Sequence, residues 1–81
     1  MKNTQPSQTP VLHDINVIVV SPEAASFGVT EFWSGDRQIG FTRTEDSELT
    51  LRIGASHDEV VLGAHALAEA LAEANRLLAL Y

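Results

Sequence analysis

Apolar residues recur at every second position in four stretches of the chain, and at helical spacing in its last third. The alternation covers residues 11–22, 26–35, 37–44 and 48–54, and it is typical of strands with one buried face. Residues 60–80 contain no proline and are rich in alanine and leucine, which predicts a long helix. The pattern therefore predicts an α+β fold: an antiparallel four-stranded β-meander with one long C-terminal helix packed on one face, in the order β-β-β-β-α.

One set of alternate residues in each predicted strand is expected to face the helix. The expected sheet core is Ile15, Val17, Val19, Phe27, Val29, Trp33, Ile39, Phe41, Leu49, Leu51 and Ile53. Its arrangement depends on the turn between the second and third strands. A two-residue turn at residues 35–36 would pair Phe32 with Ile39, whereas a loop over residues 34–36, or a bulge, gathers the core on one face. We expect the longer loop or a bulge, because burial outweighs turn preference.

The predicted helix starts at a capping box, with Ser56 as the N-cap and Glu59 three residues later. Its apolar positions are spaced alternately by four and three residues, which predicts one stripe packed on the sheet. The stripe consists of Val60, Ala64, Leu67, Leu71, Ala74 and Leu78. Such a helix is about 35 Å long and a seven-residue strand about 23 Å, so the helix is expected to overhang the sheet.

The helix carries more apolar surface than one sheet needs. Two alanine-rich flanks lie beside the stripe, one with Val61, Ala68, Ala72 and Ala79, the other with Ala66, Ala70 and Leu77. These alanines are explained by helix propensity or by close approach of a second helix. Because 81 residues bury little surface alone, we expect self-association, with a symmetric homodimer as the default form. The expected contacts are Phe32, on the outer face of the sheet, and Leu62, Leu77 and Leu80.

The chain is acidic, with a formal net charge of −6 and only five Lys or Arg residues. Nucleic acids and anionic membranes would repel it, so neither is the favoured partner. There is no cysteine, and no stretch has the roughly 18 apolar residues of a membrane span. Residues 1–10 are polar, and we expect a disordered tail followed by a single domain over residues 11–81. These features indicate a cytoplasmic protein.

Candidate chemistry is sparse. The three histidines, at positions 13, 57 and 65, lack metal-site spacing, and the glycines do not form a phosphate-binding motif. The serines lie at turns and caps, where serine is common. Glu31 falls on the predicted apolar face, so a small-ligand or catalytic role around this carboxylate is a minor hypothesis. We therefore expect no enzyme activity, metal or cofactor, and a protein-interaction module whose partner the sequence does not identify.

Three arginines supply the alternative function. Arg37, Arg43 and Arg52 lie on the predicted sheet or its turns, where they could bind nucleic acid through the sheet face. Nearby acidic residues instead favour cross-strand ion pairs. Binding that collapses as salt rises would identify the nucleic-acid alternative.

The order strand–strand–strand–helix, with "FWSGDRQIGFTR" and the late helix "AHALAEALAEANRLLAL", resembles a group of small actinobacterial proteins. The resemblance spans residues 15–80 and implies a double-stranded-RNA-binding-domain-like fold. This chain differs by the additional strand "ELTLRIG". The group has no established function, and RNA binding does not carry over, because the helix here is acidic.

Overall fold

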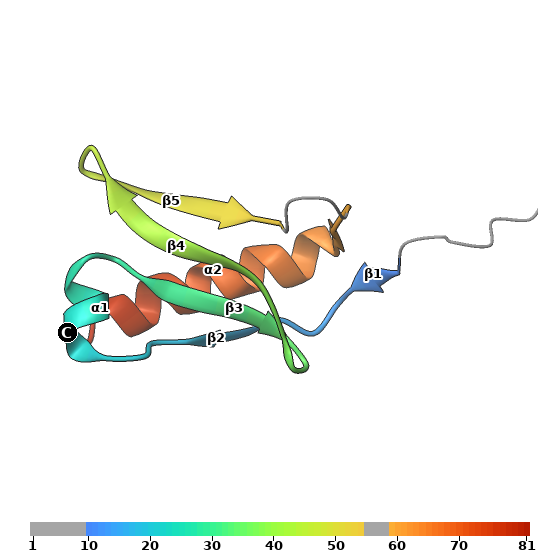
Figure 1. The fold of residues 1–81 in the computed structure, drawn as a ribbon, viewed down its shortest axis with the longest axis horizontal. Coiled ribbons are helices and arrows are strands. Elements are labelled where there is room, and N and C mark those ends of the chain that lie inside the picture. Colours follow the sequence, from blue (N-terminus) through green and yellow to red (C-terminus); the bar gives the residue numbers. More distant parts are fainter. Residues whose placement is uncertain (1–9, 55–58) are drawn as a thin grey trace, which may run out of the picture.

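The computed structural model describes residues 10–54 and 59–81. Four antiparallel strands form one sheet in chain order, and a helix lies across one of its faces (Figure 1). The strands are β2 (Asn16–Ile18), β3 (Thr30–Ser34), β4 (Arg37–Glu45) and β5 (Glu48–Ile53), and the helix is α2 (Ala64–Leu78). The predicted α+β meander with a C-terminal helix is confirmed. The predicted disordered tail, apart from Pro10, lies outside the described residues.

Two short strands and a short helix complete the fold. β1 (Val11–Leu12) and β6 (Val61–Leu62) pair in parallel, and α1 (Pro22–Ser26) connects β2 to β3. The sequence prediction contained no helix at α1. The side chain of Ser21 caps this helix by accepting a 3.0 Å hydrogen bond from the Ala24 amide. The signal was present in the sequence "SPE", which combines an N-cap serine, a first-turn proline and an acidic residue.

The face of β3 that packs on the core is the opposite of the predicted one. Thr30 and Phe32 are buried, while Glu31 and Trp33 lie on the outer face of the sheet. Phe27 precedes the strand and is 60% exposed. The assignment of Phe27 and Trp33 to the core, and of Phe32 to the outer face, was therefore wrong.

The cause is a two-residue turn at residues 35–36 combined with a bulge in β4. Gly35 has φ of 63°, as the first turn position of a type II′ turn requires. The register then shifts so that Phe32 lies opposite Gly40 instead of Ile39. A side chain on Gly40 would meet a backbone oxygen of β5 at 2.5 Å, so the strands approach closely only because this residue is glycine.

After the bulge, β4 continues with the opposite face assignment as well. Phe41 lies on the outer face between Glu31 and Arg52, so its assignment to the core was wrong. Thr42 occupies the inner face and is fully buried. Ile39 remains in the core as predicted, at 3% exposure, because the bulge keeps it on the helix side.

The β4–β5 hairpin closes with a two-residue turn in which Asp46 and Ser47 have φ of 53° and 65°. Both turn positions therefore adopt the left-handed conformation of a type I′ turn, which favours Asn-Gly. Ser47→Gly is expected to raise the free energy of unfolding by about 0.5–1 kcal/mol, because glycine adopts positive φ without steric strain. Chemical denaturation measures this difference. As a control, Ser34→Gly in regular strand should instead destabilise the protein.

α2 begins later than predicted. The chain at Val61 and Leu62 is extended, and the amide of Gly63 donates a 2.9 Å hydrogen bond to the Leu12 carbonyl. Gly63 is the N-cap, so the proposed capping box does not start this helix; Glu59 precedes it and Ser56 lies outside the described residues. With 15 residues, α2 is about 22 Å long, and the expected overhang is absent.

α2 packs on the sheet through alanines. Ala70 and Ala74 form the buried cluster together with Phe32 and Ile39. The helix lies over β2 and β3, where its small side chains allow a close approach. In the predicted stripe, Ala74 is buried and Ala64 is exposed, while the others are half-buried. The helix is thus rotated toward the flank that carries Ala66, Ala70 and Leu77.

Candidate interaction surface

The inner face of the β4–β5 hairpin is only partly covered by α2. Leu49, Leu51 and Ile53 lie on this face because they pair with Thr44, Thr42 and Gly40, and Thr42 is in the core. Leu51 packs against the buried cluster, whereas Ile53 is 43% exposed. The predicted inward orientation of these three β5 residues is correct, but their burial is incomplete.

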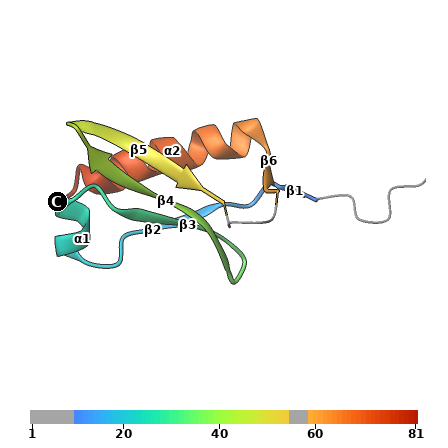
Figure 2. The same ribbon diagram turned by 45° about the horizontal axis from the view of Figure 1, so that its top comes forward.

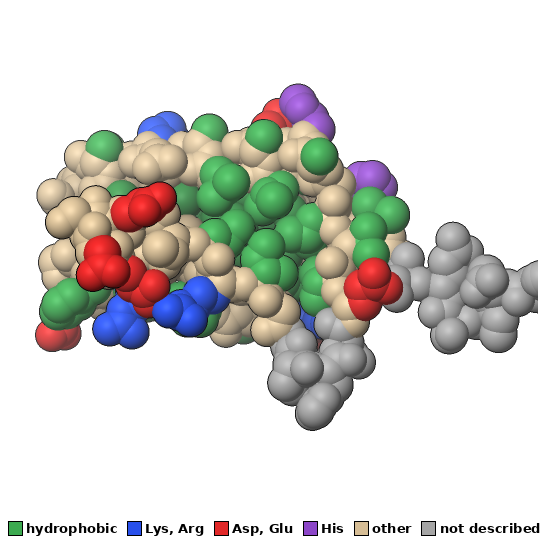
Figure 3. All heavy atoms as spheres, turned by 90° about the horizontal axis from the view of Figure 1, so that it is seen from above, with side chains coloured by type: hydrophobic (Ala, Val, Ile, Leu, Met, Phe, Trp, Pro, Cys, Tyr) green, Lys and Arg blue, Asp and Glu red, His purple; other side chains and the backbone are tan. Residues whose placement is uncertain are grey.

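The flank of α2 nearer the hairpin carries leucines. Ala66, Glu69 and Glu73 line a cleft on the β2 side of the helix, so the opposite flank faces β5. Leu67, Leu71 and Leu78 occupy that flank and are half-buried. Figure 3 shows hydrophobic side chains gathered between the helix and the hairpin. We call this surface the open apolar face; it consists of Leu49, Leu51, Ile53, Leu67, Leu71 and Leu78.

The four predicted contact residues differ in exposure and in location. Phe32 is 1% exposed and belongs to the core, so a contact through this residue is excluded in the folded chain. Leu62 is half-buried and packs against the core cluster. Leu77 is half-buried, and Leu80 is 69% exposed near the C-terminus, which lies beside α1 (Figure 1, Figure 2). The sequence pattern missed the open apolar face, because it assigned the helix leucines to the closed core.

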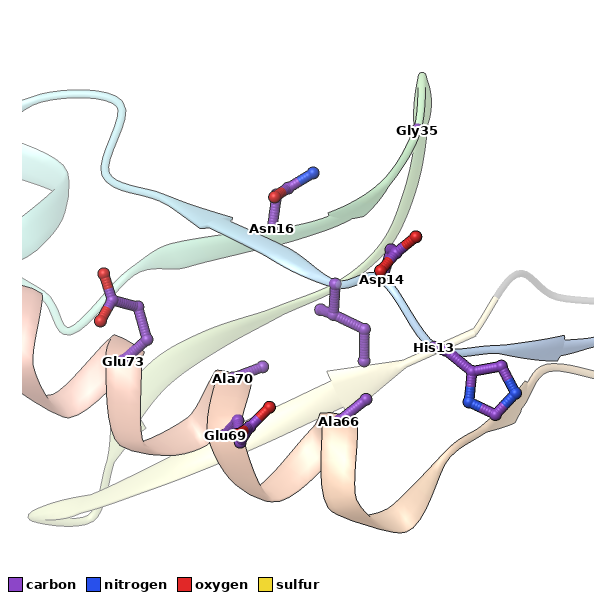
Figure 4. A pocket seen from close by; sticks show the side chains of 9 residues that line it. His13, Asp14, Asn16, Gly35, Ala66, Glu69, Ala70 and Glu73 are labelled. Carbon is purple, nitrogen blue, oxygen red and sulfur yellow. The ribbon is translucent and has the colours of Figure 1, made fainter.

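A second feature is an open cleft of about 650 Å³ between the β2 edge and α2. Its walls carry His13, Asp14 and Asn16 on one side and Glu69 and Glu73 on the other (Figure 4). Among the described residues, no group of three or more His, Cys, Asp or Glu side chains is placed to hold a metal ion. The cleft is acidic and solvated.

Two carboxylates of this cleft have partners on α2. Glu69 lies 3.2 Å from the His65 imidazole. Glu73 accepts two hydrogen bonds from Arg76, at 2.8 and 2.7 Å. The hydrogen bonds from Arg76 lower the pKa of Glu73, so this carboxylate is ionised at neutral pH. The Arg76 guanidinium reduces the negative potential that the cleft presents to solvent.

The outer face of the sheet holds the arginines of the alternative hypothesis. Arg43 and Arg52 lie on this face, and Arg37 is at the β3–β4 turn. Arg52 is bonded to Glu45, and its hydrogen bond lowers the pKa of that carboxyl. Arg43 and Arg52 both act on the Glu45 carboxyl, whereas Arg37 lies at the β3–β4 turn, so the three exposed guanidinium groups do not form one basic patch.

Glu31 also lies on the outer face, where its carboxylate has a partner. The Trp33 indole Nε1–H donates a 3.0 Å hydrogen bond to Glu31 Oε1. Glu31 is half-buried. The carboxylate that seemed misplaced in the sequence pattern therefore belongs to the solvent side of the sheet.

In the described part of the chain, no helix has both the length and the apolar character needed to cross a membrane. Comparisons with protein-family models, with curated proteins and with solved structures found no match.

Proposed function

We propose that this protein is a protein-interaction module without catalytic activity, which self-associates through the open apolar face. The observation that carries the proposal is this face itself, because contiguous apolar side chains that remain partly exposed are typical of contact surfaces. Within the described residues, Phe32 and Ile39 are the only large hydrophobic side chains that are buried. A domain of this size gains little stability from such a core, so burial of a further apolar surface is favourable.

A matched pair of isoleucines tests the proposal. Ile53 is on the open apolar face and 43% exposed, and Ile18 is on the outer face of the sheet and 42% exposed. Ile53→Lys is expected to weaken self-association at least tenfold, because a lysine ammonium would be desolvated at the contact. Ile18→Lys changes the charge equally and should leave association unchanged.

The measurement is molar mass by sedimentation equilibrium over a micromolar concentration range. We expect the wild-type chain to approach twice its monomer mass of 8.8 kDa. A wild-type protein that stays monomeric would refute self-association, and greater sensitivity at Ile18 would move the contact to the outer face.

Nucleic-acid binding is the second candidate, and one observation favours it. The strand register places Phe41 beside Arg52 on an exposed sheet face, an arrangement suited to stacking with bases. The bond between Arg52 and Glu45, and the net charge of −6, favour the first proposal. Affinity for single-stranded RNA or DNA that falls steeply with salt, and is lost in Arg43→Ala, would support the second candidate.

A further inference from the structure

α2 has apolar surface that its own sheet does not use. At about 100° per residue, the polar and ionisable side chains of His65, Glu69, Glu73 and Arg76 occupy one narrow arc of the helix. The sheet covers the arc around Ala70 and Ala74. The remaining arc carries half-buried leucines followed by the exposed alanines Ala68, Ala72 and Ala79. A helix that is apolar on most of its circumference is typically enclosed by protein.

The inner face of the sheet is wider than one helix can cover. Four strands span about 19 Å across the sheet, and one helix covers about 10 Å, so a single helix leaves about half of the inner face open. In this protein α2 lies over β2 and β3, so the inner side of the β4–β5 hairpin is only partly covered. Residues 1–9 of the chain contain one apolar residue, Met1, and do not have the composition to fill that place.

We infer that the partner is a second copy of this chain, interlocked so that α2 of each copy lies over the β4–β5 hairpin of the other. The two helices then lie side by side between two sheets. The leucine flank of each α2 contacts the partner's helix, and the alanine flank around Ala72 contacts the inner face of the partner's β5. This inference rests on the proposed function and specifies its geometry.

The buried area is sufficient for this arrangement. β5 is about 20 Å long and α2 about 22 Å, so the hairpin face and two sides of the helix offer roughly 600 Å² as flat area. Accessible area that follows the side chains is larger than flat area, and a stable interface buries roughly 800 Å² per partner. The surface carries no carboxylate: its polar groups are Thr44 on β4 and Asn75 on α2, and His65 and Arg76 border it on the helix. The net charge of −6 is therefore located away from the contact.

A substitution at Ala72 distinguishes this arrangement from other dimers. Ala72→Arg preserves helix propensity and, in an isolated chain, places the guanidinium in solvent. In the interlocked dimer the same side chain must enter the partner's hairpin face, so we expect association to weaken at least tenfold. Glu69→Gln makes the same change in net charge on the charged arc and should have no effect. Circular dichroism of both variants confirms that they are folded.

The direct measurement is an isotope-filtered NOE spectrum of a sample that mixes labelled and unlabelled wild-type protein. We expect intermolecular contacts between the Ala72 methyl group and the methyl groups of Leu49 or Leu51. A wild-type monomer would overturn both the proposed function and this inference. A dimer that lacks these contacts and is insensitive to Ala72→Arg would overturn the inference alone. If the β5 amides that point away from β4 exchange slowly with solvent in that dimer, the two copies instead pair edge to edge through their β5 strands.

Discussion

Phe32→Ala is expected to lower the free energy of unfolding by about 4 kcal/mol, the largest effect of any single substitution considered in this chain. The side chain is 1% exposed and forms the centre of the cluster with Ile39, Ala70 and Ala74. Because its neighbours are small or held in the sheet, they cannot move far enough to fill the cavity that loss of the phenyl ring creates. The total stability of a domain of this size is of similar magnitude, so the variant should be largely unfolded at physiological temperature.

Phe41→Ala is the matched control, since it removes the same side chain one strand away on the opposite face. Phe41 is half-buried beside Glu31 and Arg52, and its loss should cost about 1–2 kcal/mol. Both variants are compared with the wild type by urea denaturation at one protein concentration, because self-association adds to apparent stability. Equal costs, or a larger cost at Phe41, would show that the faces of the sheet are reversed.

The alternation of apolar residues predicts that reversed arrangement, and one charged residue shows why it is wrong. With Val29, Trp33 and Phe41 inside, the Glu31 carboxylate would also be inside and unpaired. In the structure Glu31 is on the solvent side of the sheet, where its carboxylate accepts a hydrogen bond from the indole of Trp33. The apolar pattern was ambiguous because both sides of β3 carry an aromatic residue. A bulge adds one residue to one strand, and periodicity alone does not locate it.

The C-terminal helix was predictable in existence but not in its start or orientation. Helix propensity favours the whole run from residue 60, yet Val61 and Leu62 pair with β1, which lies about fifty positions earlier in the chain. Only Val60 and Val61, two β-branched residues shortly before Gly63, indicate this tertiary contact. The rotation of α2 follows from packing: Ala70 and Ala74 allow the helix closer to β2 and β3 than leucines would.

The same rotation explains what could be predicted of the candidate surface. The surplus of apolar positions on the helix is visible in the sequence, and the structure leaves several of these positions half-buried or exposed. Its location is not visible, because a pattern assigns the leucines to the core whenever they form the most regular stripe. Leu67, Leu71 and Leu78 are only half-buried because Ala70 and Ala74 occupy the core positions of the helix.

Thr42→Val is expected to destabilise the protein by about 3 kcal/mol, because it removes a hydroxyl that makes three buried hydrogen bonds. Thr42 Oγ1 donates to the Gly28 carbonyl at 2.8 Å and accepts from the Thr30 amide at 3.0 Å. Since its proton is directed to Gly28, it also accepts from the Thr30 hydroxyl, at 2.6 Å. Valine has nearly the same shape, so the loss reports the hydrogen bonds and not a cavity.

Thr30→Val separates this network from ordinary packing. Thr30 is as deeply buried as Thr42 and lies directly opposite it, but within residues 10–54 and 59–81 its hydroxyl makes only the one hydrogen bond to Thr42. Its substitution should cost about 1 kcal/mol, and its amide keeps the bond to Thr42 Oγ1. Urea denaturation with unchanged m-values measures both costs. Equal costs would contradict the assigned hydrogen-bond directions, in which the Thr30 hydroxyl donates to Thr42 and the Thr42 hydroxyl donates to the Gly28 carbonyl. Negligible costs for both would contradict the strand register, because only the observed bulge brings these two threonines together inside the sheet.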